Sequence, residues 1–140
     1  MKSKTLIGGL IAGVVSFLLG WLVFGILLKG YYDANMVAQY PGLMKANPYM
    51  PALIVANLAW GMLLAYIMDA SGANSMAKGF ICGLIVFFLV TLGADSFSIA
   101  FMRLMRIRLA IVDIGAGALF GGIIGAVVGW WYGRGNKGTA

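Results

Sequence analysis

The most constraining feature of this chain is a long apolar run near its C-terminal end, residues 109–132. The run contains one acidic residue, Asp113, and no basic residue. It is long enough to cross a bilayer as a helix, which takes about 20 residues. The aromatic triplet at residues 130–132 closes it, as interfacial aromatic belts close many membrane helices. The run therefore predicts a transmembrane helix over about residues 108–132.

Three further apolar runs predict membrane spans near residues 5–28, 52–70 and 76–101. Of the 140 residues, 62% are hydrophobic and only 10% are charged, whereas a soluble domain has about 25% charged residues. The first run is too long for a signal peptide, and no small-residue cleavage site follows it. We expect one domain, residues 1–140, with an all-α fold: an antiparallel bundle of four transmembrane helices.

The longest connection lies between the first two runs and predicts a short interfacial helix near residues 31–40. Tyr32, Met36 and Tyr40 are spaced four apart, so they share one face of such a helix. An amphipathic helix of this kind lies along the membrane surface. The Pro41-Gly42 pair would end it.

Small residues recur at every fourth position in the first and last spans. This spacing places them on one helix face, where two helices in lipid can approach closely. One interpretation is contact between the first and last helices of a single chain, and the other is a pore or a homo-oligomer interface. We expect the first. The predicted packing residues are Gly9, Gly13 and Gly20 in the first span, and Gly117, Gly121, Gly125 and Gly129 in the last.

Polar residues of three spans fall at a similar depth, near the face opposite the chain ends. Asn57 is six residues beyond Pro51 and Asp113 five beyond Arg108, about 9 and 7.5 Å into the membrane at 1.5 Å per residue. One interpretation is a polar pocket for a headgroup, an ion or a proton. The other, which we favour, is an aspartate–arginine pair that joins the third and fourth helices. The candidate site residues are Asn57, Asp95, Asp113, Arg103, Arg106 and Arg108.

The composition argues against several classes of function. The chain has no histidine and one cysteine, Cys82, within an apolar run, so zinc sites built on imidazole and cysteine–histidine catalysis are not available. We expect no enzyme activity, metal or cofactor. The net charge of +6 comes from residues that flank the spans, which favours anionic lipid headgroups rather than nucleic acid as partners.

Two stretches together resemble a known group of proteins. One is GWLVFG at residues 20–25, and the other is VDIGAGALFGGIIGAVVGWW at residues 112–131. The chain resembles small bacterial four-helix membrane proteins that are classed as a domain of unknown function. Asp113 matches their aspartate near the start of the last helix, whereas their Trp-Tyr pair is Trp21-Leu22 here. The resemblance implies a bacterial inner membrane and no particular activity.

Two functions follow as hypotheses. The first is a structural or assembly role, in which the glycine-rich faces pack with a second copy or a larger membrane partner. The alternative is a transporter or channel-like protein that binds a small polar or amphipathic ligand or an ion at the level of Asn57, Asp95 and Asp113. Four spans place both ends of the chain on one side. Basic residues divide five against five between the two sides, and we expect the ends to be cytoplasmic.

Overall fold

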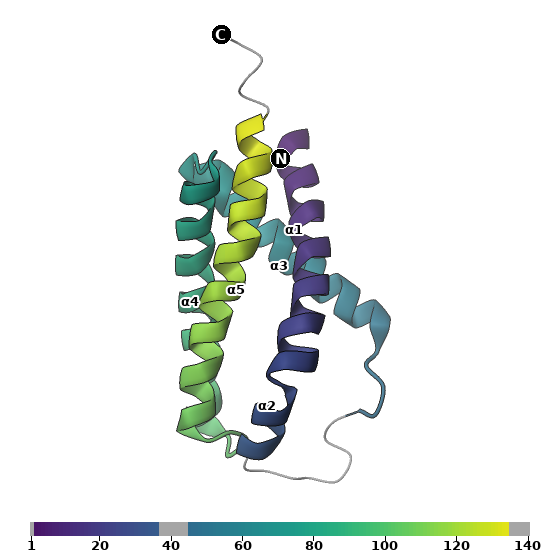
Figure 1. The fold of residues 1–140 in the computed structure, drawn as a ribbon, viewed down its shortest axis with the longest axis vertical. Coiled ribbons are helices and arrows are strands. Elements are labelled where there is room, and N and C mark those ends of the chain that lie inside the picture. The colour runs from purple at the N-terminus through teal and green to yellow at the C-terminus, as the bar shows by residue number, and fades with distance from the viewer. Residues whose placement is uncertain (1, 37–44, 135–140) are drawn as a thin grey trace.

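A computed structural model describes residues 2–36 and 45–134 of the chain, and its regular structure there is helical. A single isolated bridge between Met36 and Met105 is the one β-type pairing among the described residues. Figure 1 shows the arrangement. The elements are α1 (Ser3–Leu22), η1 (Val23–Leu27), α2 (Lys29–Asn35), α3 (Met50–Ser71), α4 (Met76–Phe101) and α5 (Ile107–Arg134).

Four helices are long and apolar enough to cross a membrane, as the sequence predicts. They span Ser3–Leu27, Met50–Ser71, Met76–Phe101 and Ile107–Arg134. Each boundary lies within two residues of the predicted one. The helical structure and the four candidate membrane spans are therefore as predicted.

The first span ends in a π-helical turn and continues into α2. In this turn the Leu28 amide donates to the Val23 carbonyl, five residues back, at 2.8 Å. The predicted helix at residues 31–40 corresponds to α2, which begins earlier, at Lys29, and ends at Asn35. Most of the predicted second half of this helix, residues 37–40, lies outside the described residues. The Arg106 amide donates to the Asn35 carbonyl at 3.2 Å, so the end of α2 is attached to the connection before α5.

The turn between α3 and α4 follows directly from its sequence. Gly72 adopts the left-handed conformation with φ 67°, which a residue without Cβ adopts at little cost. The Ala73 amide then donates to the Met68 carbonyl at 2.9 Å, as in a Schellman motif. The Ser75 hydroxyl accepts from the Lys78 amide at 3.3 Å and caps α4.

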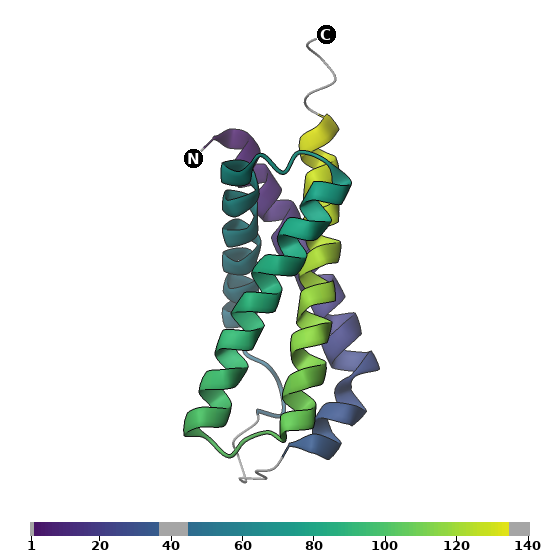
Figure 2. The same ribbon diagram turned by 90° about the vertical axis from the view of Figure 1, so that its left-hand side faces the viewer.

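The glycine row of α5 packs on α4, so the prediction that it packs on the first helix is wrong. A Cβ on Gly121 or Gly125 would collide with the backbone of Gly83 or Gly79, and a Cβ on Gly117 would meet Thr91 Oγ1 at 2.6 Å. α4 carries its own small-residue face at the right spacing, and two glycine faces allow the closest backbone approach. Figure 2 shows the two helices side by side, closest near the α3–α4 turn and wider apart toward residues 102–106.

The small-residue face of α1 packs mainly on α3. A Cβ on Gly9 would meet Met62 Sδ at 2.6 Å, and one on Gly13 would meet Leu58 Cδ2 at 2.8 Å. α1 and α5 are in contact, as predicted, and of the predicted packing residues of α1 only Gly20 faces α5. Gly8 faces the Tyr132 ring, and Gly20 faces the Phe120 ring at 3.7 Å.

Polar contacts join the helix ends that lie near the two chain termini. Lys4 Nζ donates to the Tyr132 carbonyl at 2.8 Å, and Thr5 Oγ1 donates to Asp69 Oδ2 at 2.9 Å. Tyr132 is only 3% exposed, and its hydroxyl donates to the Ala65 carbonyl at 3.2 Å. Its predicted place in an interfacial belt is therefore wrong, since it packs inside the bundle, whereas Trp130 is exposed.

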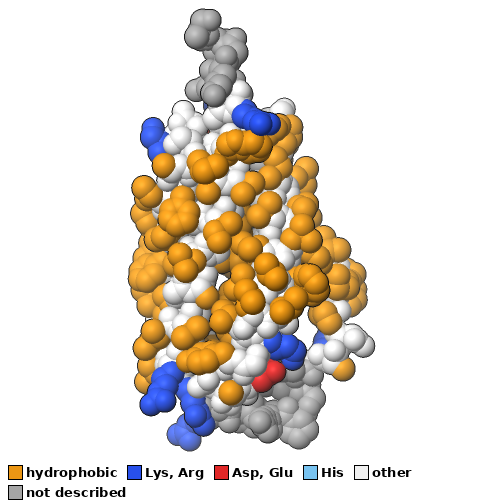
Figure 3. Space-filling view, in the orientation of Figure 1, with side chains coloured by type: hydrophobic (Ala, Val, Ile, Leu, Met, Phe, Trp, Pro, Cys, Tyr) orange, Lys and Arg blue, Asp and Glu red, His pale blue; other side chains and the backbone are white. Residues whose placement is uncertain are grey.

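The outer face of the bundle is largely hydrophobic, and its charges lie at the two ends. Figure 3 shows lysine and arginine side chains near both ends of one face and hydrophobic side chains between them. This distribution matches a bilayer core with headgroup regions on either side.

Candidate functional site

A cavity of about 870 Å³ lies between the four spans. It forms because α3 crosses the bundle at an angle and moves away from α5 toward its Met50 end (Figure 1). α1 crosses α3 and diverges from it, and its continuation through η1 and α2 returns to the α4–α5 connection (Figures 1 and 2), so the lower halves of α3 and α5 separate with α1 between them. The cavity occupies this opening.

Three of the six predicted site residues line this cavity. Asn57 comes from α3, Asp95 from α4 and Asp113 from α5. These three residues from three different spans therefore lie around one cavity, at the shared depth that the sequence predicts. Two further polar residues, Ser16 of α1 and Thr91 of α4, also line it.

Asn57 is held in place by two hydrogen bonds. Its Oδ1 accepts from the Ser16 hydroxyl at 2.8 Å, and its Nδ2 donates to the Leu53 carbonyl of its own helix at 2.8 Å. Ser16 is only 3% exposed. An amide has two donor hydrogens and a two-lone-pair oxygen, so Asn57 retains one hydrogen and one lone pair for a molecule in the cavity.

Asp95 is a buried carboxylate without a protein counter-charge. The residue is 5% exposed, and its Oδ2 is buried without a hydrogen-bond partner. Asp113 is partly buried and lines the same cavity. A buried charged group is costly unless it is paired.

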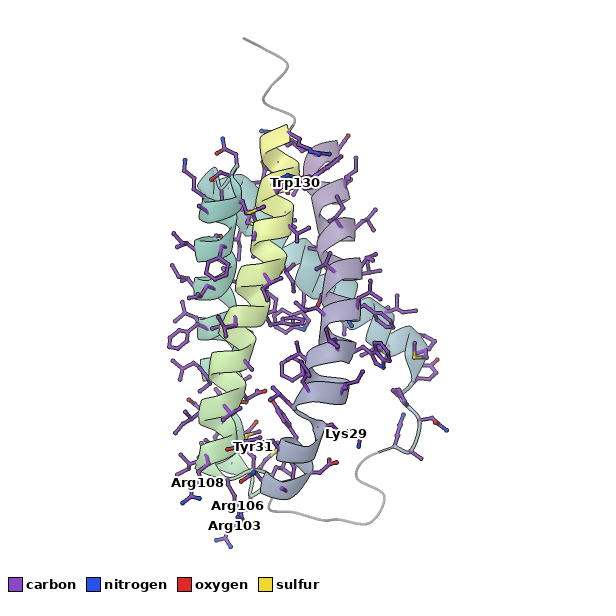
Figure 4. The ribbon with its side chains drawn as sticks, in the orientation of Figure 1. Lys29, Tyr31, Arg103, Arg106, Arg108 and Trp130 are labelled. Atoms are coloured by element: carbon purple, nitrogen blue, oxygen red, sulfur yellow. The ribbon has the colours of Figure 1, made fainter. Side chains whose placement is uncertain are left out.

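The expected aspartate–arginine pair is not formed. The one salt bridge among the described residues joins Lys29 Nζ to Asp33 Oδ2 at 3.3 Å, at an exposed place on α2. Figure 4 shows Arg103, Arg106 and Arg108 at the end of the α4–α5 connection, where they extend outward. All three are exposed and none lines the cavity, because guanidinium groups near a helix end reach the headgroup region more favourably than a buried site.

Aromatic rings form much of the remaining wall, a feature that the sequence analysis did not single out. Phe87 lies at its centre, with its ring centroid 6.0 Å from that of Trp60 and 5.7 Å from that of Phe120. Phe120 in turn lies 5.7 Å from Phe24 of the π-helical turn. Phe17, Trp21 and Phe24 recur at helical spacing in the first span, but the other rings come one each from α3, α4 and α5, so no single sequence pattern brings all of them together. The aromatic lining residues are Phe17, Trp21, Phe24, Trp60, Phe87 and Phe120.

A second, smaller pocket of about 180 Å³ lies at the other end of the bundle. Lys4, Asp69 and Tyr132 line it, and the hydrogen bonds of Lys4 and Tyr132 are already made within the chain. We regard this pocket as part of the polar contacts that join the helix ends. No group of three or more histidine, cysteine or acidic side chains is placed to hold a metal ion within the described ranges.

The chain was compared with known families, curated proteins and solved structures. No protein-family profile matches it, and no curated protein and no solved structure is significantly similar.

Proposed function

We propose that this protein binds a small amphipathic molecule inside the membrane, the first step of carrier-type transport. The cavity between the four spans carries this proposal. Its volume of about 870 Å³ falls in the range of about 300–1,000 Å³ that small-molecule sites occupy. Its wall is mostly aliphatic and aromatic, with a few polar side chains at one level. Such a wall suits a ligand with an apolar body and a polar group.

The glycine faces give less support to the assembly role that the sequence favours. The row from Gly117 to Gly129 is covered by α4, and Gly9 and Gly13 are covered by α3. These faces are occupied within one chain, so they are not free to hold a second copy. The exposed hydrophobic residues fit a surface in contact with lipid tails and do not require a protein partner.

The membrane setting completes the proposal. We place the four spans as an antiparallel bundle in a bacterial inner membrane, with both chain ends on the cytoplasmic side and α2 along the opposite surface. The exposed Lys29, Tyr31 and Asp33 of α2 suit a headgroup region. Anionic lipid headgroups neutralise the exposed arginines between α4 and α5.

Binding can be tested with three probes of similar build and different charge: tetraphenylphosphonium, tetraphenylborate and triphenylphosphine oxide. The purified protein in a neutral detergent, with Trp130→Phe and Trp131→Phe, retains only Trp21 and Trp60, which line the cavity. We expect saturable quenching of this fluorescence by at least one of the probes.

A cavity-filling variant identifies the place of binding. Ala94→Phe puts a ring into the cavity, and Ala100→Phe puts the same ring on the same helix outside it. We expect Ala94→Phe to abolish the quenching and Ala100→Phe to retain it. If no probe gives saturable quenching, or if both variants behave like the parent, the proposed function is wrong.

A further inference from the structure

We infer that the ligand of this cavity carries a positive charge, and that Asp95 together with Asp113 is its counter-charge. The inference rests on the proposed function and names its ligand class: an amphipathic amine or another lipophilic cation. It begins from the charges around the cavity. Asp95 and Asp113 are the only ionisable residues among those that line it. The described cavity therefore has two acids and no base.

The state of Asp95 points to a partner that the chain does not supply. Asp95 is 5% exposed, one of its carboxylate oxygens has no hydrogen-bond partner, and the residue lines a space large enough for a ligand. Intramembrane acids are costly, and they usually pair with another group or mark a binding site. A cation in the cavity would give Asp95 the missing partner.

The cations of the chain itself are engaged or distant in the described structure. Lys29 pairs with Asp33 on the surface of α2, and Lys4 bonds the Tyr132 carbonyl at the other end of the bundle. Arg103 and Arg106 are exposed in the connection between α4 and α5. No lysine or arginine is among the residues that line the cavity, so a charged partner for Asp95 would be a bound molecule.

The aromatic wall favours the same sign of charge. The faces of aromatic rings carry negative potential and attract cations, and tryptophan does so most strongly. Trp21, Trp60 and Phe87 line the space that Asp95 and Asp113 line. An anion would be repelled by the two carboxylates and by the negative potential of the rings. A cation with an apolar body would be attracted by the carboxylates and the rings, and its apolar part would contact the hydrophobic wall.

The experiment compares tetraphenylphosphonium with tetraphenylborate, which have nearly the same shape and opposite charge. Binding is measured by quenching of Trp21 and Trp60 in neutral detergent. We expect the cation to bind at least about tenfold more tightly than the anion, because the carboxylates of Asp95 and Asp113 attract the cation and repel the anion. Triphenylphosphine oxide, which is neutral, reports whether the cavity accepts an apolar body of this kind.

The carboxylates are then tested one at a time. We expect Asp95→Asn and Asp113→Asn each to weaken tetraphenylphosphonium binding by about tenfold or more, and Asp95→Glu to retain most of it. Asp33→Asn is the matched control, because it removes the same charge from an exposed ion pair outside the cavity. It should bind as the parent does. Unchanged binding of triphenylphosphine oxide shows that each variant is folded.

The source of the cation is distinguished in lipid nanodiscs. If an aminolipid headgroup occupies the site, phosphatidylethanolamine will compete with tetraphenylphosphonium, and discs of phosphatidylglycerol alone will not. If the natural ligand is a free amphipathic cation, the two lipid compositions will give equal binding. Either result supports a cation site.

Two outcomes would overturn the inference. One is equal affinity for the phosphonium and the borate, and the other is phosphonium binding that survives both aspartate substitutions. In either case the fluorescence of Trp21 and Trp60 would still report an occupied cavity, so the proposed function would stand. Absence of saturable binding by all three probes would instead remove the proposed function itself.

Discussion

At the scale of single residues, the contact between α4 and α5 depends on glycines that lie directly against the facing backbone. A Cβ on Gly83 would collide with the Gly121 carbonyl, whereas a Cβ on Gly93 of the same helix would meet nothing within 4 Å. Backbone atoms cannot move aside as a side chain does. The two glycines therefore provide a test of close packing within one helix.

We expect Gly83→Ala to lower the free energy of unfolding by about 1–3 kcal/mol, as overpacking of a close contact does. Gly93→Ala should be neutral, or should raise stability by up to ~1 kcal/mol through better helix propensity. Unfolding of both variants by sodium dodecyl sulfate from neutral-detergent micelles measures the difference. Equal stability of the two variants would contradict the packing of α4 on α5.

At the scale of an element, the turn between α3 and α4 depends on the left-handed conformation of Gly72. Nothing lies within 4 Å of a Cβ built there, so a side chain would meet no steric obstacle beyond the backbone itself. Any loss of stability on substitution therefore comes only from holding a residue with a Cβ at a positive φ. We expect Gly72→Ala to cost about 1–2 kcal/mol of stability.

Gly72→Asn should cost less, since asparagine enters this conformation more readily than alanine. Gly30→Ala in α2 is the matched control, because its Cβ is equally free and its backbone has no positive φ. Thermal unfolding in detergent measures all three. If Gly72→Ala and Gly30→Ala have the same melting temperature, the left-handed conformation of Gly72 at the end of α3 contributes nothing to stability.

At the scale of the whole molecule, the start of α1 and the end of α5 lie together at one end of the bundle, and the α4–α5 connection lies at the other end. Figure 1 shows this arrangement, and the hydrogen bond from Lys4 to Tyr132 fixes the near end. In a membrane, the two ends should therefore be accessible from one side. The connection at residues 102–106 should be accessible from the other.

A cysteine scan in a Cys82→Ala background tests this topology. We expect a membrane-impermeant maleimide to label Lys2→Cys and Arg134→Cys from one side of sealed vesicles, and Arg103→Cys and Lys29→Cys only from the other. Labelling after detergent lysis controls for intrinsic reactivity. Labelling of Lys2→Cys and Arg103→Cys from the same side would contradict a four-span arrangement.

Much of this architecture is determined by the sequence alone. In a bilayer core every backbone polar group needs an internal partner, so an apolar run of about 20 residues has to be a helix. The number of the four spans and their approximate bounds follow from that requirement. The shared depth of Asn57, Asp95 and Asp113 follows from the rise per residue of a helix.

Only the tertiary structure decided which faces meet. Small-residue faces occur on α1, α4 and α5 with the same spacing, so the sequence allows several pairings of these helices. In the structure, the glycine face of α5 packs against that of α4. The rotation of each helix about its axis, which the sequence leaves open, turns Asp95 into the bundle while the arginines reach outward. The cavity arises from the crossing angle of α3, which depends on the bulk of side chains from several helices at once.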